Sequence, residues 1–302
     1  MHFSSSLMFL AVLLRHYATL ARLRSEILNQ SDIPNEQQHS HDPNKLNHVP
    51  VYRTSSYPTP GHVDVVLPAN QNFSCSPLAQ GLSLDDCNYM ASIGMFGQGK
   101  NPLASNGRIW IGSDGPNTFT FINGGGGSLS LIMWYTDLND NQASFMNVRQ
   151  PEISYSLPDA GSAVEISVAN GVPGGWTVLY DHVTELNPYG QISNTFGEFS
   201  TGSWATVDIS RLVNMSGDPM AIRVYAGEPA TTDGLKPVCV SDLETCAYAC
   251  RVAGINSCGD TGTYDLINCG GPNAVKSTDL HGNPNGGCQG WSYGGHIDVV
   301  IT

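Results

Sequence analysis

The chain has 302 residues, of which 40% are hydrophobic and 13% charged, and its formal net charge at pH 7 is -13. This composition can bury a sizeable core, which excludes a chain that is disordered throughout. The excess of acidic groups repels phosphate, so nucleic acid and anionic membranes are excluded as partners, whereas neutral glycans and cationic surfaces are not.

Residues 1–21 are predicted to be a signal peptide. The apolar run from Leu7 to Leu14 is too short to cross a bilayer and has the length of the hydrophobic segment of an export signal. A polar stretch rich in Pro, His and Asn predicts a disordered leader over residues 22–60. We expect an extracellular protein, free or associated with the cell wall, that has no membrane contact after signal removal. N-glycans are predicted at two sequons, Asn72 and Asn214.

The phrase GHVDVV at residues 61–66 returns as GHIDVV at residues 295–300. In an extended strand its His and Asp lie on one face and most of its apolar residues on the other. In one hypothesis both copies are half-buried strands of one sheet, and in a second the first copy competes with the second for one edge site before maturation. In a third the copies bind a divalent metal through His62, Asp64, His296 and Asp298. Because a His-x-Asp pattern alone is unspecific, we predict no metal.

Residues 61–110 are predicted to form an N-terminal extension of the folded domain. All eight cysteines lie beyond residue 74 and none forms a CxxC pair, which predicts four disulfides rather than a zinc site. The local pairings Cys75–Cys87 and Cys250–Cys258 are expected. The partners of the other four stay open, namely Cys239, Cys246, Cys269 and Cys288.

Alternation of apolar and polar residues predicts strands from residue 108 onward, and hence a mainly β fold. The clearest runs are GRIWIG, NTFTFING, SLSLIMWYTDL and AVEISVANGVPGGWTVLY. Gly124–Gly127 is predicted to be a hairpin turn, because a phosphate-binding loop would need a Lys-Ser/Thr pair and a following helix. Core packing is expected for most of the large aromatic rings, with a sugar-stacking platform as the alternative, among Trp110, Trp134, Trp176, Trp204, Trp291, Tyr135, Tyr180 and Tyr293.

Three stretches carry a resemblance to a known family. NTFTFINGGGGSLSLIMW resembles the opening strands of thaumatin-like proteins, and LPDAGSAVEISVANGVPGGW resembles a later pair of strands. NTFGEFSTGSWATVDISRLVNMSGDPMAIRV is similar to the family's Glu-Phe, Asp-Ile-Ser and Pro-Met signature. From Cys75 onward the chain also resembles fungal secreted allergens of the Asp f four type, which are grouped with plant-infection effectors. The resemblance implies a thaumatin-like β-sandwich over residues 111–302 with a small disulfide-rich C-terminal appendage.

Thaumatin-like proteins carry an acidic cleft that some members use to bind or slowly cleave β-1,3-glucan. The resemblance places the catalytic pair at Glu198 and Asp208, and we add Trp176 and Tyr180 as glycan contacts. A further family Asp falls on Val213, and the family Arg falls on Tyr180. Glycoside hydrolysis needs a protonated carboxyl beside a second carboxylate, and valine cannot carry a proton.

Two other interpretations of the acidic positions stay open. Asp218 or Asp181 could replace the missing carboxyl if the fold brings one of them near. Alternatively, Glu198 and Asp208 are structural groups that bond backbone amides or pair with an arginine, namely Arg211 or Arg223.

We therefore predict a secreted fungal allergen-like or effector-like protein that is non-catalytic, needs no cofactor, and binds cell-wall β-glucan or a host extracellular protein. One alternative is a weak endo-β-1,3-glucanase that uses Glu198 and Asp208. Another is a structural protein of the cell wall or spore coat.

Overall fold

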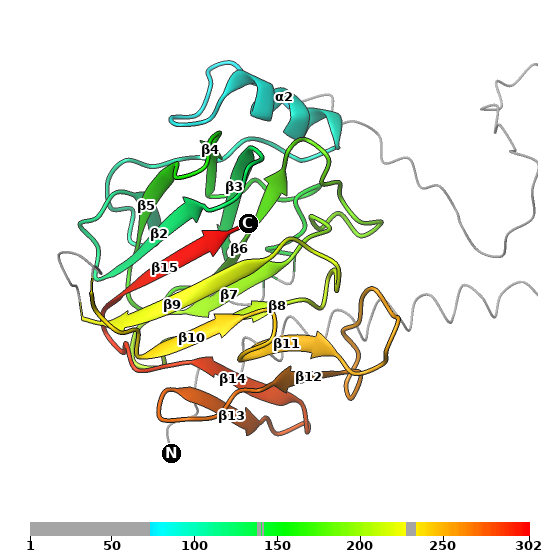
Figure 1. The fold of residues 1–302 in the computed structure, drawn as a ribbon. Helices are drawn as coiled ribbons and strands as arrows, with labels where there is room; N and C mark the ends of the chain where they lie inside the picture. Colours follow the sequence, from blue (N-terminus) through cyan, green and yellow to red (C-terminus); the bar gives the residue numbers. More distant parts are fainter. Residues whose placement is uncertain (1–72, 138–139, 141, 228–233) are drawn as a thin grey trace, which may run out of the picture.

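The computed structural model describes residues 73–137, 140, 142–227 and 234–302 (Figure 1). The predicted signal peptide, the leader, the first copy of the repeat and Asn72 lie outside these residues. β-Strands dominate the described part, which confirms the mainly β prediction. None of the helices described there combines the length and the apolar character that a membrane span requires.

The smaller of two sheets has six strands. Their order across the sheet is β1 (Ile109–Ile111), β5 (Ala163–Val168), β2 (Asn117–Asn123), β15 (Gly295–Ile301), β9 (Met220–Ala226) and β10 (Cys239–Asp242). The C-terminal strand β15 lies in the interior of this sheet, parallel to β2 and antiparallel to β9 (Figure 1).

The larger sheet contains nine strands. Seven follow one another in the order β12 (Tyr264–Ile267), β11 (Ala247–Cys250), β8 (Thr206–Ser210), β7 (Phe196–Ser200), β6 (Pro173–Tyr180), β3 (Leu129–Tyr135) and β4 (Ile153–Leu157). The hairpin of β13 (Ala274–Thr278) and β14 (Pro284–Cys288) joins this sheet through β8. The cysteine-rich C-terminal segment is therefore hydrogen-bonded into the large sheet.

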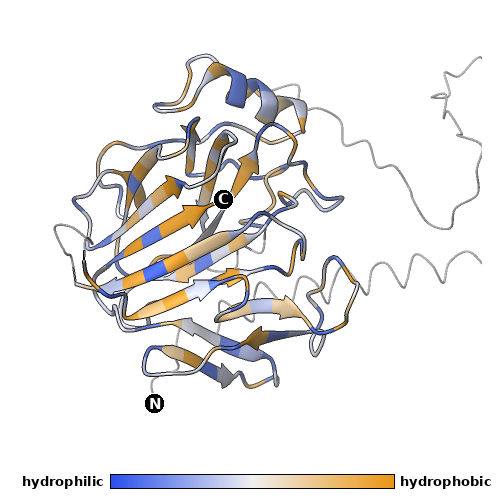
Figure 2. Ribbon diagram, in the orientation of Figure 1, coloured by the Kyte–Doolittle hydropathy of each residue, from blue (hydrophilic) through white to orange (hydrophobic). Residues whose placement is uncertain are grey.

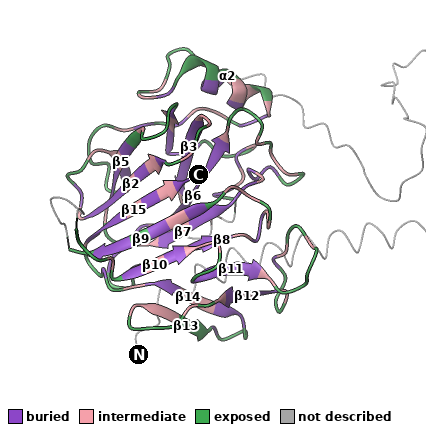
Figure 3. Ribbon diagram, in the orientation of Figure 1, coloured by how far each residue is buried: buried purple, intermediate pink, exposed green. Residues whose placement is uncertain are grey.

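Side chains of the two sheets meet in a buried core, and most of the buried residues lie on strands, although β13 is largely exposed (Figures 2 and 3). Phe119 on β2 lies at its centre, with its ring centroid 5.6 Å from that of Trp176 on β6 and 5.2 Å from that of Phe199 on β7. Burial of such large rings is a main source of the stability of a β fold.

The alternation predicted for the terminal copy of the repeat is confirmed. Ile297, Val299 and Ile301 are fully buried in the core. His296 points to the opposite face, where its Nδ1 lies 2.7 Å from the Thr118 hydroxyl and its Nε2 lies 3.0 Å from Asp298. Because β15 has a strand on both sides, the edge site assumed for this copy is wrong. Among the described residues no cluster of three or more metal-ligating side chains occurs.

Four disulfides join the eight cysteines, as predicted. The two local pairings are confirmed as Cys75–Cys87 and Cys250–Cys258. The other two bridges are Cys239–Cys288 and Cys246–Cys269. Three of the four bridges thus tie the C-terminal segment to itself or to β10, where a short strand alone would hold few apolar contacts.

The N-terminal extension folds onto the outer face of the large sheet through helix α2 (Leu84–Ser92) (Figure 1). Ser83 caps the helix, because its hydroxyl accepts a hydrogen bond from the Asp86 amide, and acidic side chains in the first turn favour the positive end of the helix dipole. Met90 and the bridged Cys87 are buried against side chains of the sheet, namely Ile132, Trp134, Leu179 and Phe196.

Candidate functional site

The two carboxyl groups expected from the sequence are neighbours in the fold. Glu198 on β7 stands directly opposite Asp208 on β8 in an antiparallel pair. Val207 and Ile209 point into the core between the sheets. Since side chains alternate along a strand, Asp208 and its partner Glu198 lie on the outer face of the large sheet.

Burial controls the protonation of this acid pair. Asp208 is only 3% exposed, and its Oδ1 has no hydrogen-bond partner within the described part of the chain. Burial raises the pKa of Glu198 to about 7, although a hydrogen bond with Ser210 acts in the opposite direction. Burial first, and then the charge of Glu198, raise the pKa of Asp208 well above its ordinary value. The pair therefore holds a proton at neutral pH.

Strand β14 covers Asp208. A Cβ atom at Gly287 would lie only 3.0 Å from Asp208 Oδ2 and 2.7 Å from the Thr206 hydroxyl, so this close approach requires glycine. Tyr248 on β11 lies nearby, since burial and then the charge of Asp208 raise its pKa well above the ordinary value. Strands of the C-terminal segment thus cover Asp208, whereas Glu198 is partly exposed.

The fold does not place the two aromatic residues predicted as glycan contacts beside the acid pair. Trp176 is 0% exposed in the core between the sheets, and its neighbour Gly175 is the residue that faces Glu198. Tyr180 packs on the core side of β6, about 16 Å along the strand from Gly175. The assignment of both residues to a glycan site around Glu198 is therefore wrong.

The arginines proposed as structural partners have other contacts. The guanidinium group of Arg211 donates hydrogen bonds to the carbonyls of Leu243 and Met215. Arg223 on β9 belongs to the small sheet, opposite Asp298 of β15. The acid pair is therefore stabilised by protonation and by the Ser210 hydroxyl, and not by the arginines that the sequence suggested.

A cavity of about 570 Å³ opens on the same side of the molecule as the N-terminal extension, between the loop of residues 183–194, the loop of residues 213–218 and residues 256–257. Val213 and Asp218, two positions considered for the family cleft, line this cavity, whereas Glu198 and Asp208 do not. The structure therefore divides the predicted cleft into an open polar cavity and a separate acid pair in which Asp208 is buried.

Amide and carboxyl groups dominate the cavity wall. The Asn194 side chain donates to Asp218 Oδ2 over 2.6 Å and accepts from the Asp218 amide over 2.7 Å, so both side chains are fixed. Tyr189, which is 42% exposed, supplies an aromatic ring, and Glu185 adds a second carboxyl. Hydrogen-bonding groups on a preformed wall, together with an exposed ring, are suited to a neutral polar ligand such as a sugar.

The Asn214 sequon lies in this cavity. Its side-chain nitrogen, the atom that N-glycosylation would modify, donates a hydrogen bond to the Ser193 carbonyl over 3.0 Å. A glycan on Asn214 would replace one of the two N–H hydrogens of this nitrogen and would compete with a ligand for the cavity, so a ligand would bind here in protein that is unmodified at Asn214. Glycosylation at this position stays a prediction.

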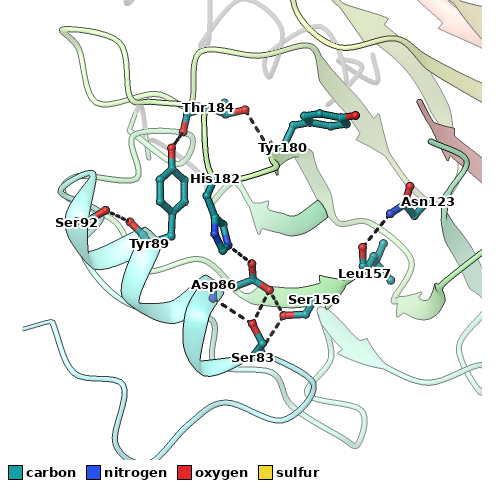
Figure 4. A network of polar contacts seen from close by, with 10 residues as sticks. All are labelled: Ser83, Asp86, Tyr89, Ser92, Asn123, Ser156, Leu157, Tyr180, His182 and Thr184. Atoms are coloured by element: carbon teal, nitrogen blue, oxygen red, sulfur yellow. Dashed lines mark hydrogen bonds and ion pairs between the residues drawn. The ribbon is translucent and has the colours of Figure 1, made fainter. Parts of the chain in front are cut away.

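Helix α2 holds one rim of the cavity through a polar network (Figure 4). At the end of β6 the chain turns through Asp181 and His182, whose φ angles are 46° and 53°, a backbone region that side chains other than glycine seldom adopt. This turn places His182 Nε2 at 2.7 Å from Asp86 Oδ1 and the His182 ring over Tyr89. The Tyr89 hydroxyl donates to the carbonyl of Thr184, a cavity residue, over 2.9 Å.

The same network holds Asp86 ionised. Burial raises the pKa of Asp86, but hydrogen bonds from Ser156, His182 and Ser83 outweigh it and leave the pKa below its ordinary value. Sequence reasoning missed this network, because Asp86 and His182 are 96 positions apart. The local signal was the Ser83–Asp86 helix cap alone.

Comparison with known proteins gives little further guidance. No protein-family model matches the chain. A stretch of 37 residues is 57% identical to the phosphatidylinositol transfer protein SFH5 of Chaetomium globosum. This match spans 12% of the present chain and 8% of that protein, which is too little of either chain to define a family.

Proposed function

We propose that this protein is a secreted, non-catalytic glycan-binding protein with a thaumatin-like β-sandwich fold, and that its ligand is a cell-wall β-glucan. The observation that carries the proposal is the cavity, in which side-chain amides, two carboxyls and the Tyr189 ring surround a space of about 570 Å³. This volume is within the range of small-molecule sites, and the polar wall suits sugar hydroxyls. Four disulfides support an extracellular location.

The separation of the acid pair from the cavity supports binding without hydrolysis. A glycosidase needs two carboxyls on either side of the scissile bond. Glu198 and Asp208 are side by side but do not line the cavity, and Asp208 is buried beneath β14. Within the cavity, the Asp218 carboxylate already accepts a hydrogen bond from the Asn194 side chain.

Calorimetric titration with soluble β-1,3-gluco-oligosaccharides tests the proposal. Tyr189→Ala and Glu185→Gln remove cavity groups and should each weaken binding about tenfold, as loss of one good contact does. Leu280→Ala is the control, since Leu280 is 85% exposed and lies on another loop. The wild-type protein should release no reducing sugar. Unchanged affinity in both cavity variants, or no binding by the wild type, would refute the proposal.

A weak endo-β-1,3-glucanase is the second candidate, and one observation favours it. Glu198 has a pKa of about 7 and sits beside a second carboxyl, which is the protonation pattern of a general acid. Release of reducing sugar from laminarin that disappears in Glu198→Gln would establish this activity. Binding of laminarin without any release of reducing sugar would support the binding function and exclude the glucanase.

A further inference from the structure

Two large aromatic side chains stand out from the surface of the fold. Trp110, Trp134, Trp176 and Trp291 are buried as expected, but Trp204 is 60% exposed. Tyr293 is 68% exposed. Trp204 lies in the turn between β7 and β8, and Tyr293 precedes β15. Rings of this size normally bury most of their surface, so a pair left in water points to a ligand.

Hydrogen bonds join the two loops that carry these rings. The Tyr293 amide donates to the Gly202 carbonyl over 3.0 Å, and the Ser292 hydroxyl lies 3.3 Å from the Ser203 carbonyl. Beneath them, Trp291 is buried and donates from its indole nitrogen to the Cys288 carbonyl. Because Cys288 is bridged to Cys239, the backbone that leads to Tyr293 is held in place without a ligand.

The backbone at Tyr293 favours a functional role for its ring. Its φ angle is 63°, in the left-handed region that costs a bulky side chain free energy and that glycine adopts without cost. The next residue, Gly294, can adopt a positive φ angle without this cost. Tyr293 is thus both strained and exposed, a combination that is found more often at binding sites than elsewhere.

The chemistry of the surrounding loops selects a neutral ligand. Residues 201–205 and 290–295 contain no charged side chain, although the chain has a net charge of -13. Their accessible polar groups are the hydroxyls of Ser203 and Ser292, whereas the Thr201 hydroxyl is buried and bonded to the backbone of the adjoining turn, which carries Asn170. Protein partners more often meet rims of charged and apolar residues, whereas a pyranose presents C–H faces to rings and hydroxyls to such polar groups.

We propose that Trp204 and Tyr293, here termed the aromatic pair, form a second binding surface that takes a neutral hexose polymer. None of the residues that line the cavity belongs to it. The cavity would hold a short oligosaccharide, and the aromatic pair would lie along the face of a long or insoluble chain. The two surfaces are therefore separable by mutation.

Retention on insoluble β-1,3-glucan, chitin and cellulose tests the aromatic pair. Trp204→Ala and Tyr293→Ala should each reduce retention on at least one polymer about tenfold or more, while Trp204→Phe, which keeps a ring, should lose about threefold or less. Leu280→Ala should behave as wild type. Retention should be unchanged between about 0.05 and about 0.5 M NaCl, roughly a tenfold change in ionic strength, because the ligand carries no charge.

Tyr293→Gly separates binding from folding. It should reduce retention like Tyr293→Ala while the melting temperature stays the same or rises, since the strain is released. Wild-type retention that survives both alanine variants, retention lost at high salt, or no retention on any of the three polymers would overturn the inference. Titration with soluble oligosaccharides remains the separate test of the cavity, so failure of one proposal does not imply failure of the other.

Discussion

Glu198 and Asp208 face each other across the β7–β8 pair, and the pKa of each carboxyl is raised there. Each carboxyl has a raised pKa because water is excluded, and the charge of Glu198 further opposes ionisation of Asp208. At these two carboxyls the folded state favours the protonated form, whereas at most surface carboxyls it favours the ionised form. The consequence is a distinct dependence of stability on pH.

Stability should decrease as pH rises from about 4.5 to 7, the ordinary and folded pKa values of Glu198. In this window the folded state binds more protons than the unfolded state, so the free energy of unfolding falls with rising pH and stays low above pH 7. Urea denaturation should show a loss of about 1–3 kcal/mol between pH 5 and 8. Asp208→Asn should flatten this slope. An unchanged slope in both Asp208→Asn and Glu198→Gln would contradict the raised pKa values of the two carboxyls.

Loss of the Asp86 carboxylate should loosen the cavity rim. Asp86→Ala leaves Ser156 and His182 without their partner and should lower the free energy of unfolding by about 1–3 kcal/mol. Because the folded pKa of Asp86 is lowered, this contribution is present above its ordinary pKa of 3.8 and is lost as pH falls through the folded value. Thermal melts at pH 7 and pH 3 measure both effects. The exposed neighbour Asp85 is the control, and an equal loss in Asp85→Ala would exclude a specific role.

Substitution of Trp176 should affect stability and not sugar binding. Trp176→Ala should cost about 3–5 kcal/mol, since the ring is fully buried between Phe119 and Phe199. Trp176→Phe retains a ring in the core and should bind oligosaccharides with wild-type affinity, as titration would show. A loss of affinity in a Trp176→Phe protein of unchanged stability would show that this residue does contribute to sugar binding.

Removal of the Cys75–Cys87 bridge should destabilise the N-terminal extension locally. The bridge closes a sequence separation of 12 residues, so the double Cys→Ser variant should lose about 2–3 kcal/mol. Hydrogen exchange should then speed up over residues 73–100, while the six-stranded sheet keeps its protection. Removal of the Cys250–Cys258 bridge is the matched comparison. This bridge lies beside cavity residue Asn256, far along the chain from residues 73–100, so hydrogen exchange should speed up around the cavity instead. Uniform loss of protection in both variants would argue against local effects.

Several features could be predicted from the sequence because they are local. Alternation along β15 correctly placed Ile297, Val299 and Ile301 in the core, since strand geometry fixes which side chains share a face. Cys75 and Cys87 lie close enough along the chain to pair with each other, as do Cys250 and Cys258, and both bridges are present. The first outcome follows from the two-residue period of a strand, and the second from the short sequence separation of the cysteines.

Only the tertiary structure decided which polar and aromatic groups meet. Core packing is the general expectation for the large rings, yet the Trp176 ring is in the core and the Trp204 ring is in water. The first faces the opposite sheet, and the second lies in a turn. The cavity and the Asp86–His182 contact join segments that are far apart along the chain. The sequence by itself determined the strands and the local bridges, whereas the packing of the two sheets and the N-terminal extension determined the sites, because burial and charge depend on neighbours that only the complete fold brings together.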